Sequence, residues 1–186
     1  MMDTLGIVLA GGLSSRYGSP KAFAQADGMA YYEIAVNALI GISSQVIIVA
    51  REEHRECYHP ETNVVTDVEP FCGCGPLAGI YSAMTFYPAL RYAVLPCDMP
   101  YMHPEVMETL VKYCADEDVI AVQADGMYHP LVAIFDQRIK STIRQSLELG
   151  QYSVMRLLKQ VKTTWIQANE LTVNTDLVFR NMNTPE

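Results

Sequence analysis

A glycine-rich segment near the start of the chain has the residue types that hold phosphate groups. It runs from Leu9 to Lys21 and reads Leu-Ala-Gly-Gly-Leu-Ser-Ser-Arg-Tyr-Gly-Ser-Pro-Lys. Gly11 and Gly12 lack a Cβ and can adopt positive φ, so backbone N–H groups there can approach phosphate oxygens closely. Arg16 and Lys21 add positive charge. The segment predicts a triphosphate site; a strand followed by a plain surface turn is the alternative.

The spacing of this segment matches neither of the two standard nucleotide fingerprints. There is no Gly-x-Gly-x-x-Gly, and Lys21 does not follow a glycine as it would in Gly-x-x-x-x-Gly-Lys-[Ser/Thr]. The loop therefore belongs to another class of phosphate-binding turn.

Two aspartates stand directly after apolar segments that are predicted to be strands. Asp67 follows Val64 and Val65, and Asp98 follows Leu95 within Pro96-Cys97-Asp98-Met99-Pro100. In open α/β sheets, ligands bind beyond the carboxyl ends of the strands. The two prolines restrict the backbone around Asp98, and a rigidly held carboxylate suits Mg²⁺ with substrate phosphates as further ligands. A helix N-cap or turn aspartate is the alternative for Asp98.

Two further groups carry residue types that invite a chemical interpretation. Cys72 and Cys74 form a Cys-x-Cys pair in a second glycine-rich loop, but zinc sites usually need four ligands and no second pair is present. The glycines of that loop, rather than its thiols, could close over a base or ribose. His129 precedes an apolar segment, and a structural, hydrogen-bonded histidine is the favoured interpretation there.

Composition limits the class of protein. The chain has 186 residues, half of them apolar, a formal net charge of −8 and five cysteines at irregular spacing. Its length and apolar content predict one domain spanning residues 1–186 with a full core. The acidic balance argues against a nucleic-acid partner, and no apolar run approaches the ~18 residues of a membrane span. The cysteine pattern is not that of a disulfide framework, so a reducing cytoplasm is expected.

Short apolar segments alternate with helical patterns, which is typical of β-α units around a mainly parallel sheet. We expect a three-layer α/β/α, Rossmann-like fold with a small antiparallel extension. Asp125-Gly126 is a hairpin signal before the apolar run 131–135, so parallel winding should stop there. Ser153 is the predicted N-cap of a late helix. The remaining expected elements are strands at 4–9, 45–49, 92–95 and 119–122, and helices over 31–39, 76–87 and from 104.

Taken together, these motifs resemble those of the molybdenum cofactor guanylyltransferases. The glycine loop and the Asp-x-Pro are shared with cytidylyl and uridylyl relatives, whereas Gly-Pro-Leu-Ala-Gly and Asn-x-Asn-Thr-Pro-Glu are more particular to the molybdopterin branch. Five matching stretches follow in order along nearly the whole chain: 9–21, 75–79, 97–101, 129–130 and 181–186.

The resemblance implies a role for individual residues. Lys21, Asp98 and Arg16 would be catalytic, with Asp98 also the ligand of Mg²⁺. Asn181 and Asn183 would contact molybdopterin, since alternation in an extended segment puts both amides on one face. GTP would be held by Leu9, Ala10, Gly11, Gly12, Lys21, Asp67 and Asp98. One position departs from the family: where relatives can have an asparagine at the end of the second strand, this chain has Val49.

The activity implied by the resemblance is transfer of GMP from GTP to molybdopterin, with release of pyrophosphate and formation of the guanine dinucleotide form of the cofactor. Molybdoenzymes and cofactor-biosynthesis proteins are implied as partners. A molybdopterin cytidylyltransferase or another NTP-dependent nucleotidyltransferase is the nearest alternative. A nucleotide-binding adaptor for molybdoenzymes, without catalysis, is the alternative from a different class.

Overall fold

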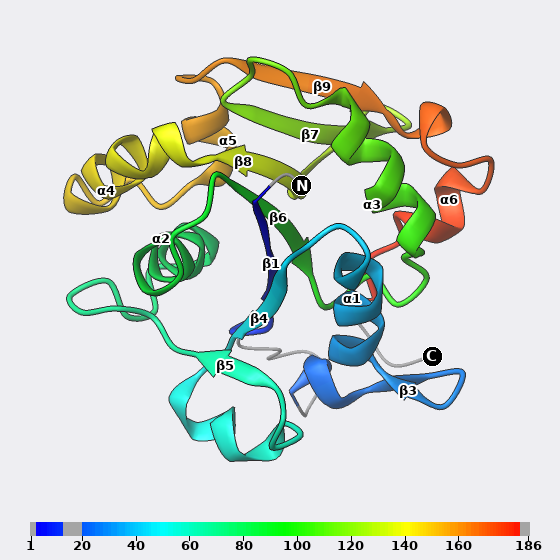
Figure 1. Cartoon of the computed structure of the whole chain (residues 1–186), viewed down its shortest axis with the longest axis horizontal. Helices are drawn as coiled ribbons and strands as arrows, with labels where there is room; N and C mark the ends of the chain where they lie inside the picture. The colour runs from blue at the N-terminus through cyan, green and yellow to red at the C-terminus, as the bar shows by residue number, and fades with distance from the viewer. Residues whose placement is uncertain (1–2, 13–19, 183–186) are drawn as a thin grey trace.

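The computed structural model describes residues 3–12 and 20–182, and these form a seven-stranded sheet with helices on both faces (Figure 1). The strand order is β5-β4-β1-β6-β8-β7-β9, and a separate two-stranded sheet pairs β2 with β3. The strands are β1 (Thr4–Leu9), β2 (Gln25–Ala26), β3 (Met29–Ala30), β4 (Gln45–Val49), β5 (Asn63–Val65), β6 (Arg91–Pro96), β7 (Val119–Ala124), β8 (Met127–Asp136) and β9 (Thr163–Gln167).

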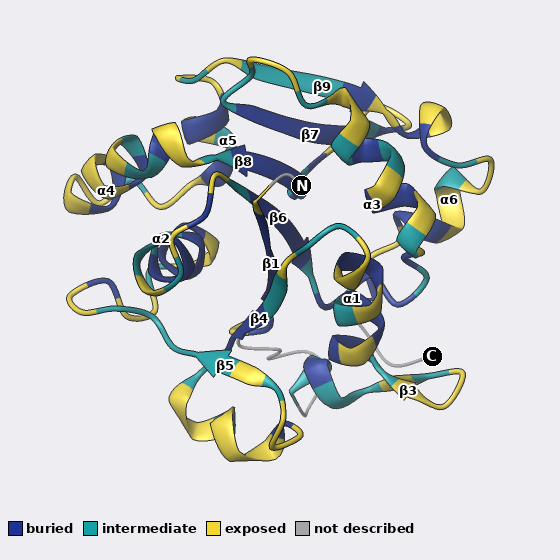
Figure 2. Ribbon diagram, viewed as in Figure 1, coloured by how far each residue is buried: buried dark blue, intermediate teal, exposed yellow. Residues whose placement is uncertain are grey.

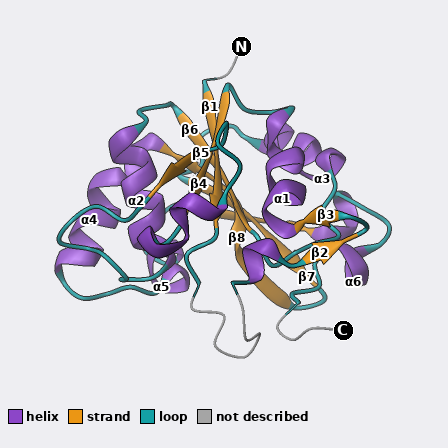
Figure 3. Ribbon diagram, turned by 90° about the horizontal axis from the view of Figure 1, so that it is seen from below, coloured by secondary structure: helices purple, strands orange, loops and turns teal. Residues whose placement is uncertain are grey.

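The helices form two layers that enclose the sheet, as seen when the molecule is turned (Figure 3). One layer packs the face that includes Val8 and Ile48, and the other packs the face that includes Ile7 and Ile47. Because successive side chains of a strand point to opposite faces, neighbouring residues of β1 serve the two cores. The α-helices are α1 (Tyr31–Ile40), α2 (Pro76–Phe86), α3 (Pro104–Leu110), α4 (Lys140–Glu148), α5 (Val154–Leu158) and α6 (Thr175–Val178).

The central strands are buried on both sides, which explains their almost continuous apolar sequences (Figure 2). β1 lies parallel to both β4 and β6, and β4 lies parallel to β5. β8 is antiparallel to β6 and to β7, as expected after the hairpin signal, but parallel pairing does not end there, because the later strand β9 lies parallel to β7. Asp125 and Gly126 both have positive φ in the turn between β7 and β8, as the hairpin signal predicts.

Other expectations hold with small shifts at the ends of elements. α2 begins at Pro76, and the Ser153 side chain accepts a hydrogen bond from the backbone N–H of Arg156 at the start of α5. β9 has no strand prediction in the sequence, yet it extends the sheet parallel to β7. Among the described residues, no helix is long and apolar enough to span a bilayer.

Candidate active site

The carboxyl ends of four parallel strands lie at one edge of the sheet and bring the predicted site residues together. β1 lies between β4 and β6, and the chain crosses from one side of β1 to the other after β5. This reversal of strand order is the point at which open α/β sheets bind ligands. The glycine loop follows β1, Asp67 follows β5, and Asp98 follows β6. The tertiary fold therefore places the glycine loop and Asp98 on adjacent strands.

The end of β1 is fixed by backbone hydrogen bonds to both neighbouring strands. The N–H of Ala10 donates to the carbonyl of Val49 at 2.8 Å, and the N–H of Cys97 donates to the carbonyl of Leu9 at 3.1 Å. Gly11 and Gly12 follow as exposed residues. Neither adopts the positive φ that glycine permits, and their approach to phosphate oxygens stays a prediction. A Cβ at either glycine would meet no atom of residues 3–12 or 20–182 within 4 Å.

Lys21 and Asp98 form the charged centre of the site. The Lys21 ammonium lies 3.7 Å from the Asp98 carboxylate, and their side chains are only 14% and 27% exposed. Burial raises the pKa of Asp98, and the Lys21 charge opposes that increase without cancelling it. The ionised Asp98 is therefore incompletely stabilised by the protein, and an additional cation would stabilise it further.

Asp98 lies in a turn after β6 and does not cap a helix, so the N-cap alternative is wrong, while the turn alternative stands beside the predicted metal-binding role. The next helix, α3, has His103 as its N-cap. The backbone carbonyl of Asp98 instead accepts a hydrogen bond from the N–H of Met182 at 2.9 Å. This contact brings the last described residues of the chain to the charged centre.

The segment around Met182 has the alternation expected of an extended chain. Met182 is buried and packs with Tyr31 and Ile34 of α1, whereas Asn181 is exposed. Asn183 and Arg16 lie outside the described residues, so their predicted roles stay predictions.

Three aromatic side chains pack around the turn that carries Lys21. Phe23 belongs to the same short 3₁₀ turn as Lys21, and its ring centroid lies 4.8 Å from that of Tyr58 and 5.8 Å from that of Tyr32. Tyr32 is on α1, and Tyr58 follows a 3₁₀ segment after β4. Both tyrosines are buried. This cluster fixes the lysine turn against the body of the protein. No pattern in the sequence predicts the cluster.

Asp67 belongs to a loop that folds back on itself before α2. Its carboxylate accepts a hydrogen bond from the N–H of Gly73 at 2.9 Å, and Gly73 has a φ of +74°. Burial raises the pKa of Asp67, and the Gly73 N–H partly offsets that effect. A side chain at Gly73 would be strained at this φ, which gives the glycine a physical reason.

Ser82 holds the next residue of this loop from the middle of α2. Its hydroxyl oxygen accepts a hydrogen bond from the N–H of Val68 at 2.8 Å and donates to the carbonyl of Ala78 at 2.7 Å. Ser82 is fully buried. A hydroxyl residue on the buried face of a mostly apolar helix is the sequence signal for this role.

Gly79 allows α2 to lie directly against the strands that end at the site. A Cβ at this position would come within 3.1 Å of side-chain atoms of Leu9 and of Val49. Contacts this short would push the helix away from β1 and β4. The second glycine of Gly-Pro-Leu-Ala-Gly is thus explained by close approach of a helix to the sheet.

The cysteines and His129 lie in environments that favour structural roles. The Cys72 thiol donates to the backbone carbonyl of Asp67 at 3.1 Å. Within residues 3–12 and 20–182, no group of three or more His, Cys, Asp or Glu side chains could hold a metal ion. His129 is buried with its ring 5.3 Å from that of Phe179, and burial lowers its pKa. Cys97 is also buried, which raises its pKa to about 12 and keeps it a neutral thiol.

The chain is similar to known proteins over most of its length. Residues 6–164 match the model of the MobA-like NTP transferase domain. The chain belongs to this family. It is 38% identical over 188 residues to a probable molybdenum cofactor guanylyltransferase of Geobacillus sp. (strain WCH70), which covers 100% of this chain and 96% of that relative. A protein of Bacillus cereus (strain AH820) with the same description is 33% identical, covering 100% of this chain and 94% of the relative.

The family's fold is also found in solved structures. Molybdopterin-guanine dinucleotide biosynthesis protein A from Archaeoglobus fulgidus superimposes with a TM-score of 0.81 at 23% identity, covering 97% of this chain and 93% of that one. The mostly parallel sheet of this MobA-like chain therefore has the same fold as the sheet of that structure.

Proposed function

We propose that this MobA-like protein transfers GMP from GTP to molybdopterin, with release of pyrophosphate. The single observation that carries the proposal is the Lys21–Asp98 pair beside the glycine loop at the crossover of the sheet. The names of relatives that match the whole length of the chain support the choice of guanylyl transfer.

In the proposed reaction, the terminal phosphate of molybdopterin attacks the α-phosphate of GTP, and the bond to pyrophosphate breaks. Lys21 binds the triphosphate, and the N–H groups of the glycine loop hold its oxygens. A phosphate nucleophile is already ionised near neutral pH, so the protein needs no general base. Its contribution is to align two anions and to offset their charge.

Asp98 is the residue that would hold Mg²⁺. The fit is chemical: one hard carboxylate, rigidly placed, whose charge the protein leaves incompletely stabilised. When bound there, the ion would neutralise charge on the phosphates. The pairing of Asp98 with Lys21 also argues against a non-catalytic adaptor, because simple nucleotide retention does not require a metal-binding carboxylate.

The acceptor would lie next to Asp98, on the side of the C-terminal segment. The contact between the Met182 N–H and the Asp98 carbonyl supports this placement, because it puts the exposed Asn181 beside the charged centre. Asn183 would complete the pair of amides. Molybdoenzymes and other cofactor-biosynthesis proteins are the partners to which the product would pass. All five cysteines are free thiols, which fits a reaction in the cytoplasm.

The deciding experiment measures pyrophosphate release with each of the four NTPs and Mg²⁺, with and without molybdopterin. We expect release only with molybdopterin and fastest with GTP. Equal or faster release with CTP would make the protein a cytidylyltransferase. CTP is included because this chain has Val49 where relatives can have an asparagine that contacts the nucleotide. No release with any NTP would refute transferase activity.

A further inference from the structure

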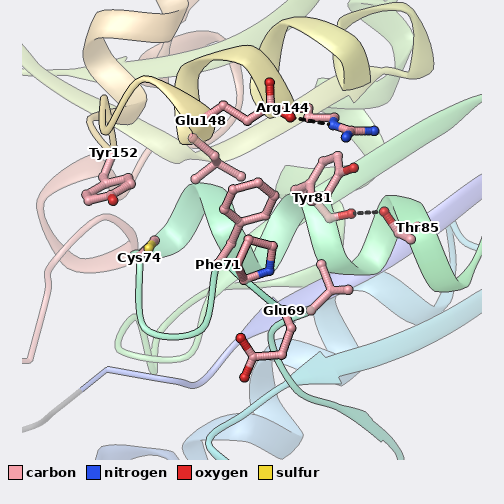
Figure 4. A pocket seen from close by; sticks show the side chains of 11 residues that line it. Glu69, Phe71, Cys74, Tyr81, Thr85, Arg144, Glu148 and Tyr152 are labelled. Atoms are coloured by element: carbon pink, nitrogen blue, oxygen red, sulfur yellow. Dashed lines mark hydrogen bonds and ion pairs between the residues drawn. The ribbon is translucent and has the colours of Figure 1, made fainter.

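A concave site lies away from the charged centre, on the surface of the helical layer. It is a cavity of about 580 Å³ between the 68–74 loop, α2 and the segment from α4 to Tyr152 (Figure 4). Lys21, Asp67 and Asp98 are not among its lining residues. Its volume falls within the ~300–1,000 Å³ typical of small-molecule sites. We call it the aromatic pocket.

Three aromatic side chains give the pocket flat, apolar surfaces. Phe71 is in the middle, with Tyr152 toward one end and Tyr81 toward the other (Figure 4). The rings of Phe71 and Tyr81 meet edge to face, with centroids 5.6 Å apart at 83°. Tyr152 is 44% exposed, whereas Phe71 is only 9% exposed. A planar aromatic ligand would therefore stack mainly on Tyr152 and contact the small exposed part of Phe71.

Polar side chains on opposite sides of Phe71 have opposite hydrogen-bonding character. The Arg144 guanidinium can only donate, and its Nε donates to Glu148 at 2.8 Å in an exposed ion pair on α4. The Glu69 carboxylate accepts when ionised, and it lies across the pocket from Arg144 (Figure 4). A matching ligand therefore needs a planar ring with acceptors along one side and N–H donors along another.

The 2-amino-4-oxopyrimidine ring meets these requirements. Its amino and ring N–H groups suit a carboxylate, and its carbonyl oxygen suits an arginine, as in arginine contacts to guanine. Guanine and pterins share this ring. We propose that the aromatic pocket binds a heterocycle with a 2-amino-4-oxopyrimidine ring, provided by a guanine nucleotide or a pterin. This rests on the proposed function, in which GTP and molybdopterin carry these two ring systems.

The loop that forms one wall of the pocket also carries Asp67. The N–H of Phe71 donates to the carbonyl of Val68 at 2.9 Å, and the N–H of Cys74 donates to the carbonyl of Phe71 at 3.1 Å. The Asp67 carboxylate is bonded to Gly73 within the same turn. A ligand packed on Phe71 stabilises this turn and with it the position of Asp67. Occupation of the pocket therefore increases GTP affinity, and GTP increases affinity for the pocket ligand by the same factor.

The test uses guanosine and neopterin as probes, because both carry the ring and neither carries a phosphate. Calorimetric titrations are made with the full chain, with Glu69→Gln, with Arg144→Met and with Arg156→Met as the control, an exposed arginine on α5. We expect at least one probe to bind the unsubstituted protein. Its dissociation constant should be about tenfold higher for each pocket variant and the same for the control. Adenosine, which lacks the amino-oxo edge, should bind at least tenfold more weakly than guanosine. The stronger of the two probes identifies the purine or the pterin as the source.

Three results would overturn the proposal. The first is that neither probe binds. The second is that adenosine binds as tightly as the better probe. The third is that probe binding is lost in Asp67→Asn but unchanged in both pocket variants. The last would locate the probe at the nucleotide site.

The coupling is tested separately: a saturating probe should lower the dissociation constant of GTP about fivefold, and an unchanged constant would refute the link through the loop. Pyrophosphate release by the unsubstituted protein, with GTP, molybdopterin and Mg²⁺ and without an added probe, is measured in parallel, and its absence would refute the proposed function rather than the pocket.

Discussion

Removal of the Lys21 charge is the most direct test of the proposed site. In Lys21→Met the side chain keeps a similar length and apolar stem but loses the ammonium 3.7 Å from Asp98. At this distance and an effective dielectric constant of about 20, two unit charges attract by about 4–5 kcal/mol before desolvation is subtracted. The same ammonium would face the triphosphate, so the substitution removes a positive charge that both Asp98 and the phosphates would contact.

We expect kcat/KM for GTP to fall by about 10²–10³-fold, the loss measured when one donor to a transition-state charge is removed. A second effect follows from the pKa of Asp98. Burial already raises this pKa, and the Lys21 charge opposes the increase. Without Lys21 the pKa rises further, so the loss of activity at acid pH should begin at a higher pH in the variant.

The assay is continuous pyrophosphate release at saturating Mg²⁺ and molybdopterin, over a range of GTP concentrations and pH. Lys159→Met serves as the matched control, because Lys159 is exposed at the end of α5. Lys21→Arg should recover part of the activity. If Lys21→Met kept the rate and the pH profile of the control, Lys21 would not bind the phosphates and the proposed site would be wrong.

Four further predictions address other parts of the molecule. Asp98→Asn should fold normally but lose Mg²⁺-dependent turnover, because an amide is a poorer ligand for a hard cation; an unchanged Mg²⁺ titration would contradict this. Ser82→Ala should leave the partly buried N–H of Val68 without its acceptor, lower stability by about 1–3 kcal/mol and raise the KM for GTP more than it lowers kcat; faster hydrogen exchange at the Val68 amide is the independent measurement. Asn183→Ala should raise the requirement for molybdopterin and leave GTP affinity unchanged in calorimetry, and equal loss of both affinities would argue against a separate acceptor site. Because burial lowers the pKa of His129 below its ordinary 6.5, this residue takes up a proton more readily in the unfolded chain as pH falls. The contribution of His129 to the free energy of unfolding should therefore decrease below pH ~6.5 with a slope of at most about 1.4 kcal/mol per pH unit, and urea titrations of His129→Leu should lack this contribution.

Local patterns in the sequence predicted β1, β4–β8, α1–α3 and α5, but not β2, β3, β9, α4 or α6, and the phosphate-binding role of the glycine loop stays a prediction. Each of these signals acts within a few residues. Proline at the first position of α2, serine at the N-cap of α5 and Asp125-Gly126 in the hairpin all set backbone geometry where they stand. The continuous apolar segments predicted buried parallel strands, because strands covered on both faces need apolar residues at every position.

Only the tertiary structure decided which of these elements meet. Lys21 and Asp98 are distant in sequence, and they pair because β1 and β6 are adjacent in the sheet. Periodicity determines which face of a strand is apolar but does not determine strand order, so it could not predict this neighbour or the place of β9. The same holds for Ser82 beside Val68, for Met182 beside Asp98 and for the aromatic pocket. Each depends on packing between segments that are distant in sequence, and the local sequence of one segment does not determine which other segment packs against it.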